Sequence, residues 1–145
     1  MSATERPRVV LVNRCFVRRE DGKLLAIRRA MADEHYPGKW EVPGGKLDMG
    51  QDLLRAQERE VMEETGYLVA PLMPLVYADS HLIGDGRYAG LPYVVLFSIT
   101  RLLGGKFALS AEHCGFTWVS CDELLDLDLT PEVWKAAIVL REHLI

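Results

Sequence analysis

Residues 44–67 read GGKLDMGQDLLRAQEREVMEETGY, a glycine pair followed by a loop and a long run of helix-forming residues. Residues 52–65 contain neither proline nor glycine and are rich in leucine, alanine, arginine, glutamine and glutamate, which predicts a helix. Asp52 is placed either to cap the N-terminus of this helix or to be an acidic residue in its first turn. Gly66 stands where glycine commonly ends a helix. The stretch therefore predicts a break in a strand, a loop and one central helix.

Three glutamates crowd the end of this helix. Glu60, Glu63 and Glu64 stand at i, i+3 and i+4, so they project within an arc of about 100°. Each like-charged pair destabilises a helix by roughly 0.2–0.5 kcal/mol, and the helix dipole disfavours negative charge at this end. A solvated acidic face is one interpretation. The other is a site for Mg²⁺ or Mn²⁺, since these ions bind convergent carboxylate oxygens.

The same helix also presents apolar residues to other parts of the molecule. Leu54 and Val61 fall on a different side from the glutamates and are expected to face the core. Leu53 and Ala56 lie over the acidic arc, nearer the start of the helix. The helix is therefore expected to pack on more than one face.

Strand patterns flank the central helix on both sides. Strands are predicted at 8–18, 24–27, 40–42, 93–102 and 116–119, with one or two more in 67–82, where Pro71 and Pro74 interrupt the pattern. Pro43-Gly44-Gly45 is expected to break the third strand, and Gly104-Gly105 to turn the chain. A capping box at Ser120 and the pair Thr130-Pro131 predict two C-terminal helices, the second running through Leu144. This order predicts a mixed α/β (α+β) layered domain.

Length and composition exclude several classes of protein. The chain of 145 residues fits one domain spanning residues 1–145. No apolar run approaches the roughly 20 residues that span a bilayer, and no secretory signal is evident, so a cytoplasmic location without membrane contact is expected. Seventeen basic and 21 acidic residues give a net charge of −4, which argues against nucleic-acid binding. An anionic substrate would need an intervening cation.

The stretch from Gly45 to Tyr67 resembles the signature box of the Nudix hydrolase family, in particular of its MutT-like members. Arg59-Glu60-Val61-Met62-Glu63-Glu64-Thr65-Gly66-Tyr67 is in register with that box, and Gly38-Lys39-Trp40-Glu41-Val42-Pro43-Gly44-Gly45 is similar to its usual lead-in. Gln51 departs from the pattern, because the family carries there a glutamate that pairs with the box arginine. The resemblance implies an α/β/α sandwich with a mixed β-sheet.

The resemblance also implies divalent-metal-dependent hydrolysis of a diphosphate linkage, with Mg²⁺ or Mn²⁺ as cofactor and a nucleotide-type substrate. Cation binding is then assigned to Gly45, Glu60, Glu63 and Glu64. Catalytic roles are assigned to Glu63, Glu112 and Arg59. Glu63 and Glu112 are alternative general bases, and Arg59 orients carboxylates.

Other residues have both a binding and a structural interpretation. Arg28 or Arg29 could hold phosphate or be a strand-end charge, and Gly44 belongs to the substrate-binding loop. Aromatic side chains could stack on a base or fill the core and loops: Tyr36, Trp40, His81, Tyr88 and Phe116. His113, Cys114 and Cys121 could suggest zinc, but without a second paired motif they are better explained as small core residues.

Three functions remain open at this point. The favoured one is a pyrophosphohydrolase acting on a nucleoside di- or triphosphate. The second is a nucleotide-binding or regulatory module of the same fold without hydrolase activity, supported only by Gln51. The third is an isomerase of the same fold acting on a prenyl diphosphate, for which no suitable cysteine lies near the box. The exact substrate stays open, and a homodimer is one possible assembly.

Overall fold

The computed structural model describes residues 8–143 of the chain. Its strands are β1 (Val10–Arg18), β2 (Leu24–Arg29), β3 (Trp40–Glu41), β4 (Gly44–Lys46), β5 (Tyr67–Leu82), β6 (Pro92–Gly105) and β7 (His113–Val119). Its helices are α1 (Leu53–Thr65), α2 (Cys121–Leu125) and α3 (Pro131–His143), so Leu144 of the expected last helix lies outside the described residues. Within residues 8–143, no helix is long and apolar enough to cross a membrane.

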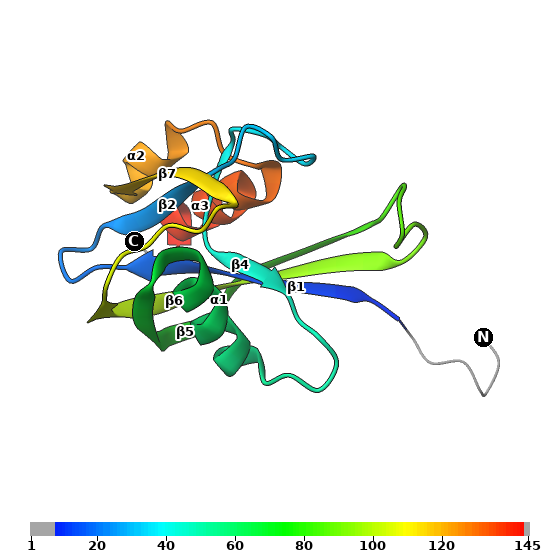
Figure 1. Ribbon diagram of the computed structural model, residues 1–145, viewed down its shortest axis with the longest axis horizontal. Helices are drawn as coiled ribbons and strands as arrows, with labels where there is room; N and C mark the ends of the chain where they lie inside the picture. The colour runs from blue at the N-terminus through cyan, green and yellow to red at the C-terminus, as the bar shows by residue number, and fades with distance from the viewer. Residues whose placement is uncertain (1–7, 144–145) are drawn as a thin grey trace.

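All seven strands belong to one sheet. Its order is β3-β2-β1-β6-β5, with β4 added to β1 and β7 added to β2. β1 and β6 run parallel over nine residue pairs, whereas the other pairs are antiparallel, so the sheet is mixed. β5 and β6 together form a long hairpin that extends away from the helices (Figure 1).

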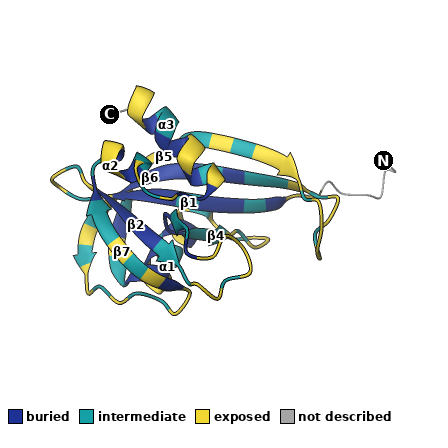
Figure 2. Ribbon diagram, turned by 90° about the horizontal axis from the view of Figure 1, so that it is seen from above, coloured by how far each residue is buried: buried dark blue, intermediate teal, exposed yellow. Residues whose placement is uncertain are grey.

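Helices cover both faces of the sheet, because its central strands bury side chains on both sides (Figure 2). Phe16 and Leu24 face the layer that contains α2 and α3. Cys15 and Val17 face the opposite layer, where they pack with Val61 of α1. The expected α/β/α arrangement with a mixed sheet is confirmed.

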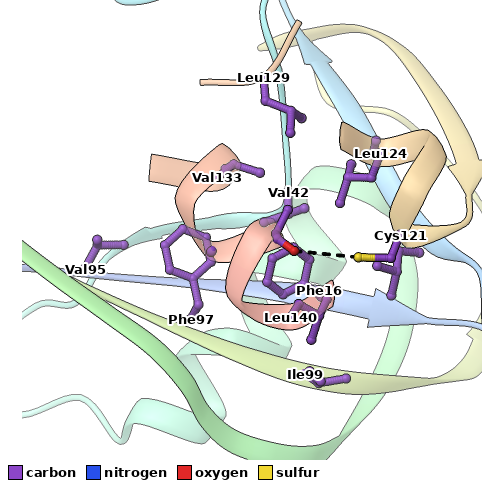
Figure 3. Close-up of a cluster of buried hydrophobic side chains, with 14 of the residues drawn as sticks. Phe16, Val42, Val95, Phe97, Ile99, Cys121, Leu124, Leu129, Val133 and Leu140 are labelled. Atoms are coloured by element: carbon purple, nitrogen blue, oxygen red, sulfur yellow. Dashed lines mark hydrogen bonds between the residues drawn. The ribbon is translucent and has the colours of Figure 1, made fainter. Parts of the chain in front are cut away.

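The larger core lies between the sheet and helices α2 and α3 (Figure 3). Phe16 of β1 and Phe97 of β6 meet with ring centroids 5.8 Å apart. Leu124 of α2 and Leu140 of α3 are fully buried in the same cluster. Each such side chain stabilises the fold by about 1.5–3 kcal/mol through removal of apolar surface from water.

The break expected at Pro43-Gly44-Gly45 is confirmed, because β3 ends at Glu41. Gly44 and Gly45 then form β4, which pairs with β1 because glycine allows a very close approach to Asn13. Three other local expectations were wrong. Gly104 and Gly105 do not turn the chain but continue β6 and pair with β5. Leu54 is 36% exposed, since Ala56 and Val61 supply the buried contacts of α1. Thr130 precedes α3, but its buried hydroxyl makes no capping hydrogen bond within residues 8–143.

The prolines of β5 do not split it into two strands. β5 is an edge strand, and its pairing with β6 is irregular between Pro71 and Met73 and again between Met73 and Tyr77. An edge strand can accommodate proline at such irregularities because the missing N–H faces away from the sheet. The strand therefore continues through both prolines.

Both ends of α1 are capped as expected. The Asp52 side chain accepts a hydrogen bond from the Arg55 N–H at 3.1 Å. At the other end Gly66 adopts φ +75°, and its N–H donates to the Met62 carbonyl. A side chain at Gly66 would also collide with the backbone of the 106–112 loop, since its Cβ would lie 2.1 Å from the Lys106 carbonyl oxygen.

We therefore expect Gly66→Ala to lower the free energy of unfolding by about 2–3 kcal/mol, from left-handed strain and from this backbone clash. Chemical denaturation measures the change. Gly50→Ala is the matched control, because Gly50 also has positive φ (+82°) but has nothing within 4 Å of a Cβ position. Equal losses in the two variants would show that the clash adds nothing.

Candidate active site

The glutamates of α1 meet the glycine pair of β4. An ideal Cβ on Gly45 would lie 2.9 Å from the carboxylate atoms of Glu60, so this carboxylate covers the glycine. The Gly44 N–H donates to Glu64 Oε2 at 3.4 Å. A side chain at Gly45 would collide with the Glu60 carboxylate, and one at Gly44 would collide with Asn13 and Arg14 of β1. The structure therefore brings together three of the residues predicted to bind a cation, Gly45, Glu60 and Glu64.

The electrostatics of this contact favour an added positive charge. Burial raises the pKa of the Glu64 carboxyl to about 9, and the carboxylates of Glu41 and Glu60 add to this rise against the opposing Arg14 charge. Burial also raises the pKa of Glu60, with further contributions from Glu63 and Glu112. Raised pKa values at adjacent acids are typical of functional sites, because the charged forms lack compensation.

The donor set fits a hard divalent cation. Carboxylate oxygens and the backbone carbonyl of Gly45 are ligands that Mg²⁺ and Mn²⁺ accept. Within residues 8–143, however, no three acidic, histidine or cysteine side chains already surround one point. Water and substrate phosphates would therefore complete the coordination, as is usual for Mg²⁺.

Glu63 and Arg59 lie on the outer side of α1. Arg59 contacts Glu63 Oε1 at 3.5 Å through Nε and Glu60 Oε1 at 3.4 Å through Nη2. The Glu63 side chain is 59% exposed, unlike those of Glu60 and Glu64. This geometry supports Arg59 as a residue that orients carboxylates. The Glu63 carboxylate is turned toward solvent and does not cover the glycine pair as Glu60 does.

Glu112 is held near the site by the loop that precedes β7. Ser110 N–H donates to the Glu64 carbonyl at 2.9 Å, and Ala30 N–H donates to the Glu112 carbonyl at 3.0 Å. The Ser110 hydroxyl also contacts His113 Nδ1 at 3.0 Å. These hydrogen bonds fix the loop on both sides of Glu112. The Glu112 side chain itself is exposed.

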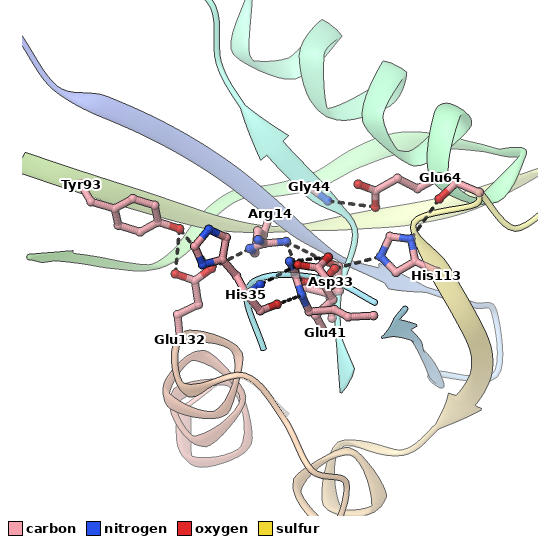
Figure 4. A network of polar contacts seen from close by, with 12 residues as sticks. Arg14, Asp33, His35, Glu41, Gly44, Glu64, Tyr93, His113 and Glu132 are labelled. Atoms are coloured by element: carbon pink, nitrogen blue, oxygen red, sulfur yellow. Dashed lines mark hydrogen bonds and ion pairs between the residues drawn. The ribbon is translucent and has the colours of Figure 1, made fainter. Parts of the chain in front are cut away.

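A buried ion-pair network adjoins the contact between Glu64 and Gly44 (Figure 4). At its centre is Glu41, whose carboxylate contacts Arg29 Nη1 at 2.9 Å, Arg14 Nη1 at 3.3 Å and His113 Nε2 at 2.8 Å. Burial alone would raise the pKa of Glu41, but these three partners hold that pKa below its usual value. Glu132 extends the network, because it binds Arg14 Nε at 2.7 Å.

An open pocket of about 700 Å³ borders this network and reaches Gly45 of the glycine pair. Its wall includes basic and aromatic side chains together: Arg14, Arg29, Lys46, Arg87, Lys135, Tyr36, His81, Tyr88 and Tyr93. Lys46 Nζ lies 4.5 Å from the centre of the Tyr88 ring, and His81 stacks on Tyr93 with centroids 4.8 Å apart. Guanidinium, ammonium and aromatic groups are suited to phosphates and a planar base.

Some of the predicted substrate-binding residues line this pocket, and others do not. Arg28 is not part of its lining, and its Nε donates to the Gly38 carbonyl at 2.8 Å, whereas Arg29 lines the pocket. Trp40 packs against the larger core and also lies outside the lining. The Gly44 N–H is directed to Glu64.

The aromatic residues considered for stacking on a base also fall into two groups. Tyr36, His81 and Tyr88 line the pocket, whereas Trp40 and Phe116 do not. Phe116 packs against Phe107 instead, with centroids 4.1 Å apart.

Sequence reasoning missed Arg14, Tyr93 and Glu132. A signal for Arg14 was present, because it stands between Val12 and Phe16 at an inward position of an alternating strand. The contacts of Glu132 with Arg14 and Tyr93 join residues 118 and 39 positions apart, and such pairings have no local signal.

The two cysteines considered for zinc are separated. Cys121 is buried, and its thiol contacts the Ala137 carbonyl, whereas Cys114 is exposed and contacts the Arg29 carbonyl. The core interpretation therefore fits Cys121, and it was wrong for Cys114.

Gln51 stabilises the loop before α1. Its Oε1 accepts a hydrogen bond from the Asp48 N–H at 2.8 Å, while Arg59 pairs with Glu60 and Glu63. We expect Gln51→Glu to keep stability and activity at or above the wild-type level, because a carboxylate accepts the same bond. Thermal unfolding and phosphate release measure this, with Gln51→Ala as the variant that loses the acceptor. A large loss in Gln51→Glu would show that the amide has a role of its own.

Comparison with known proteins agrees with this geometry. The NUDIX domain model matches residues 9–141. The chain is 36% identical over 106 residues to a MutT-like protein of Streptomyces ambofaciens, covering 73% of this chain but only 60% of that protein's length. It is 34% identical over 110 residues to a putative 8-oxo-dGTP diphosphatase 2 of Mycobacterium tuberculosis, covering 76% of this chain and 74% of that protein.

A solved structure shares the fold. The MutT protein of Methanosarcina mazei Go1 superposes with a TM-score of 0.72 over 98% of this chain and all of that one, at 23% identity. The glycine pair, the helix carrying Glu60 and Glu64 and the mixed sheet thus occur within a domain match that spans nearly the whole described chain. The chain belongs to the Nudix hydrolase family, with MutT-like relatives.

Proposed function

We propose that this protein hydrolyses a diphosphate linkage in a nucleoside di- or triphosphate with the help of Mg²⁺ or Mn²⁺. The observation that carries the proposal is the meeting of Glu60 and Glu64 with the glycine pair at the edge of a pocket lined by basic and aromatic groups. Among the relatives, the Mycobacterium tuberculosis protein is named as a putative 8-oxo-dGTP diphosphatase, and a 26% identical Escherichia coli relative as a nucleoside triphosphatase.

The roles of the residues follow from their positions. Glu60, Glu64 and the Gly45 carbonyl would hold the cation, which when bound neutralises phosphate charge and lowers the pKa of water. Lys46 lines the pocket wall beside Gly45 and is placed to bind phosphate oxygens. Arg29 also lines this wall, but its guanidinium is already bonded to Glu41, to Asp33 and to the His35 carbonyl. The aromatic side chains Tyr88 and His81 of the pocket wall would receive the nucleoside.

The general base is either Glu63 or Glu112. Both side chains are exposed, and both lie near enough to raise the pKa of Glu60. Either side chain could accept a proton from an attacking water, because an ionised carboxylate is a proton acceptor. Glu63→Gln and Glu112→Gln distinguish them, since loss of the base removes the acidic limb of the pH profile of kcat.

The test is a panel of dNTPs, NTPs, ADP-ribose, sugar nucleotides and dinucleoside polyphosphates, each with Mg²⁺ or Mn²⁺. Release of phosphate or pyrophosphate with at least one of them, only in the presence of the cation, is expected. Isotope-labelled water then identifies the phosphorus that is attacked. Cation and nucleotide binding without any release would instead support the binding or regulatory module.

A further inference from the structure

Two buried amide side chains in the layer between the sheet and α1 have no hydrogen-bond partner in the described part of the chain. Asn13 is 1% exposed and Gln57 is 2% exposed. Neither the oxygen nor the nitrogen of either side chain finds a partner within residues 8–143. Buried amides are nearly always paired in proteins, because an unpaired one loses its hydrogen bonds to water without replacement. The two side chains therefore need a further explanation.

Asn13 lies beside the cation-binding contact. It is the register partner of Gly45 in the antiparallel pairing of β1 and β4. Directly opposed residues in such a pair project to the same face of the sheet. On that face the Glu60 carboxylate covers Gly45. The Asn13 side chain consequently lies on the sheet surface against which Glu60 packs.

Gln57 approaches the same contact from the helix. It precedes Glu60 by three residues and Glu64 by seven on α1, so the three side chains follow one face of the helix. Gln57 and Glu64 are both buried, and Glu60 is half-buried between them. Two unpaired amides from opposite layers thus border the two carboxylates.

We propose that Asn13 and Gln57 are positioning residues of the cation site, whose amides hydrogen-bond to the water ligands of the ion and to Glu60 when the site is loaded. This inference rests on the proposed function. Mg²⁺ and Mn²⁺ sites of this kind retain several water molecules, each with two hydrogens to donate. Amide oxygens accept such hydrogens, and amide N–H groups donate to carboxylates and so fix their orientation.

The test measures Mn²⁺ binding without nucleotide, by calorimetry and by the EPR signal of free Mn²⁺, in Asn13→Leu and Gln57→Met. These variants keep side-chain size and remove the amides. We expect the Kd for Mn²⁺ to rise about tenfold in each, as for other residues that support metal ligands. The unfolding temperature of the metal-free protein should rise, because unpaired polar groups are removed from the interior. At saturating Mn²⁺, turnover should recover to within about threefold of wild type.

Thr100→Val is the matched control. Thr100 is a buried polar residue whose hydroxyl contacts Cys15 Sγ in the same layer, away from the glycine pair. Its removal should leave the Kd for Mn²⁺ unchanged. If Asn13→Leu or Gln57→Met prevents folding, Asn13→Ala and Gln57→Ala are used instead. The alanine variants remove the amides without adding atoms, and the same change in Kd is expected.

Two results would overturn the inference, and they differ. A higher unfolding temperature with a Kd within twofold of wild type would mean that the amides do not serve the ion, while the proposed function stands. Absence of Mn²⁺ binding and of hydrolysis in the wild-type protein would remove the proposed function and the inference together.

Discussion

Glu64→Gln is expected to reduce turnover by about a hundredfold or more and to weaken cation binding strongly, while the fold remains intact. Glutamine has the same shape and can still accept the Gly44 hydrogen bond, which is 3.4 Å long in the wild type. It cannot supply the negative charge that the cation requires, and loss of even a supporting residue costs 10–100-fold in metal affinity. Phosphate release, Mn²⁺ titration and circular dichroism measure the three effects. Turnover within a few-fold of wild type would contradict the role of Glu64.

The same variant has an expected effect on pH dependence. Burial raises the pKa of the Glu64 carboxyl from 4.5 to about 9 in the folded, metal-free protein. Between these values the folded state holds a proton that the unfolded state has released, so stability falls as the pH rises through that range. Glu64→Gln removes this contribution.

Thermal unfolding with a chelator measures this pH effect. We therefore expect the metal-free wild type to lose more stability than the variant between pH 6 and pH 9. Parallel curves for the two proteins would show that Glu64 is already ionised at neutral pH.

The parts of the fold that could be predicted from sequence are those governed by local patterns. The run from Asp52 to Gly66 contains its own caps and helix formers, so the bounds of α1 were predicted to within one residue. The capping box at Ser120 likewise marks the start of α2. Gly104 and Gly105 of β6 were assigned to a turn, and Gly44 and Gly45 of β4 to a break after the third strand, because glycine favours turns locally. Their strand pairing depends on the close approach of a distant strand.

In the candidate site, too, the residues that could be predicted are those with a local sequence pattern. Glu60 and Glu64 were identified because their spacing on one helix is local information, and the structure places both against the glycine pair. The choice between Arg28 and Arg29 required the sheet, since neighbouring residues of a strand face opposite sides. The unpaired amides of Asn13 and Gln57 could not be anticipated, because only their three-dimensional surroundings show that no partner is near among residues 8–143.

Glu41→Gln is expected to lower the free energy of unfolding by about 3 kcal/mol. The substitution removes the negative charge that lies between the guanidinium groups of Arg14 and Arg29, and its side chain is only 5% exposed. Removing one partner of a buried ion pair costs about 3–5 kcal/mol, because a charge is left uncompensated. The lower end applies here, since Arg14 keeps Glu132 and Arg29 keeps Asp33.

Asp21→Asn is the matched control for Glu41→Gln, because it makes the same chemical change at an exposed arginine pair. Asp21 binds Arg19 at 2.7 Å, but the two side chains are 48% and 36% exposed, so a much smaller loss of stability than in Glu41→Gln is expected. Urea denaturation of both variants measures the difference. Glu41→Gln should also raise KM more than it lowers kcat, because Arg14 and Arg29 line the pocket and lose their common anchor. Equal losses of stability in the two variants would show that the buried network contributes no more than a surface pair.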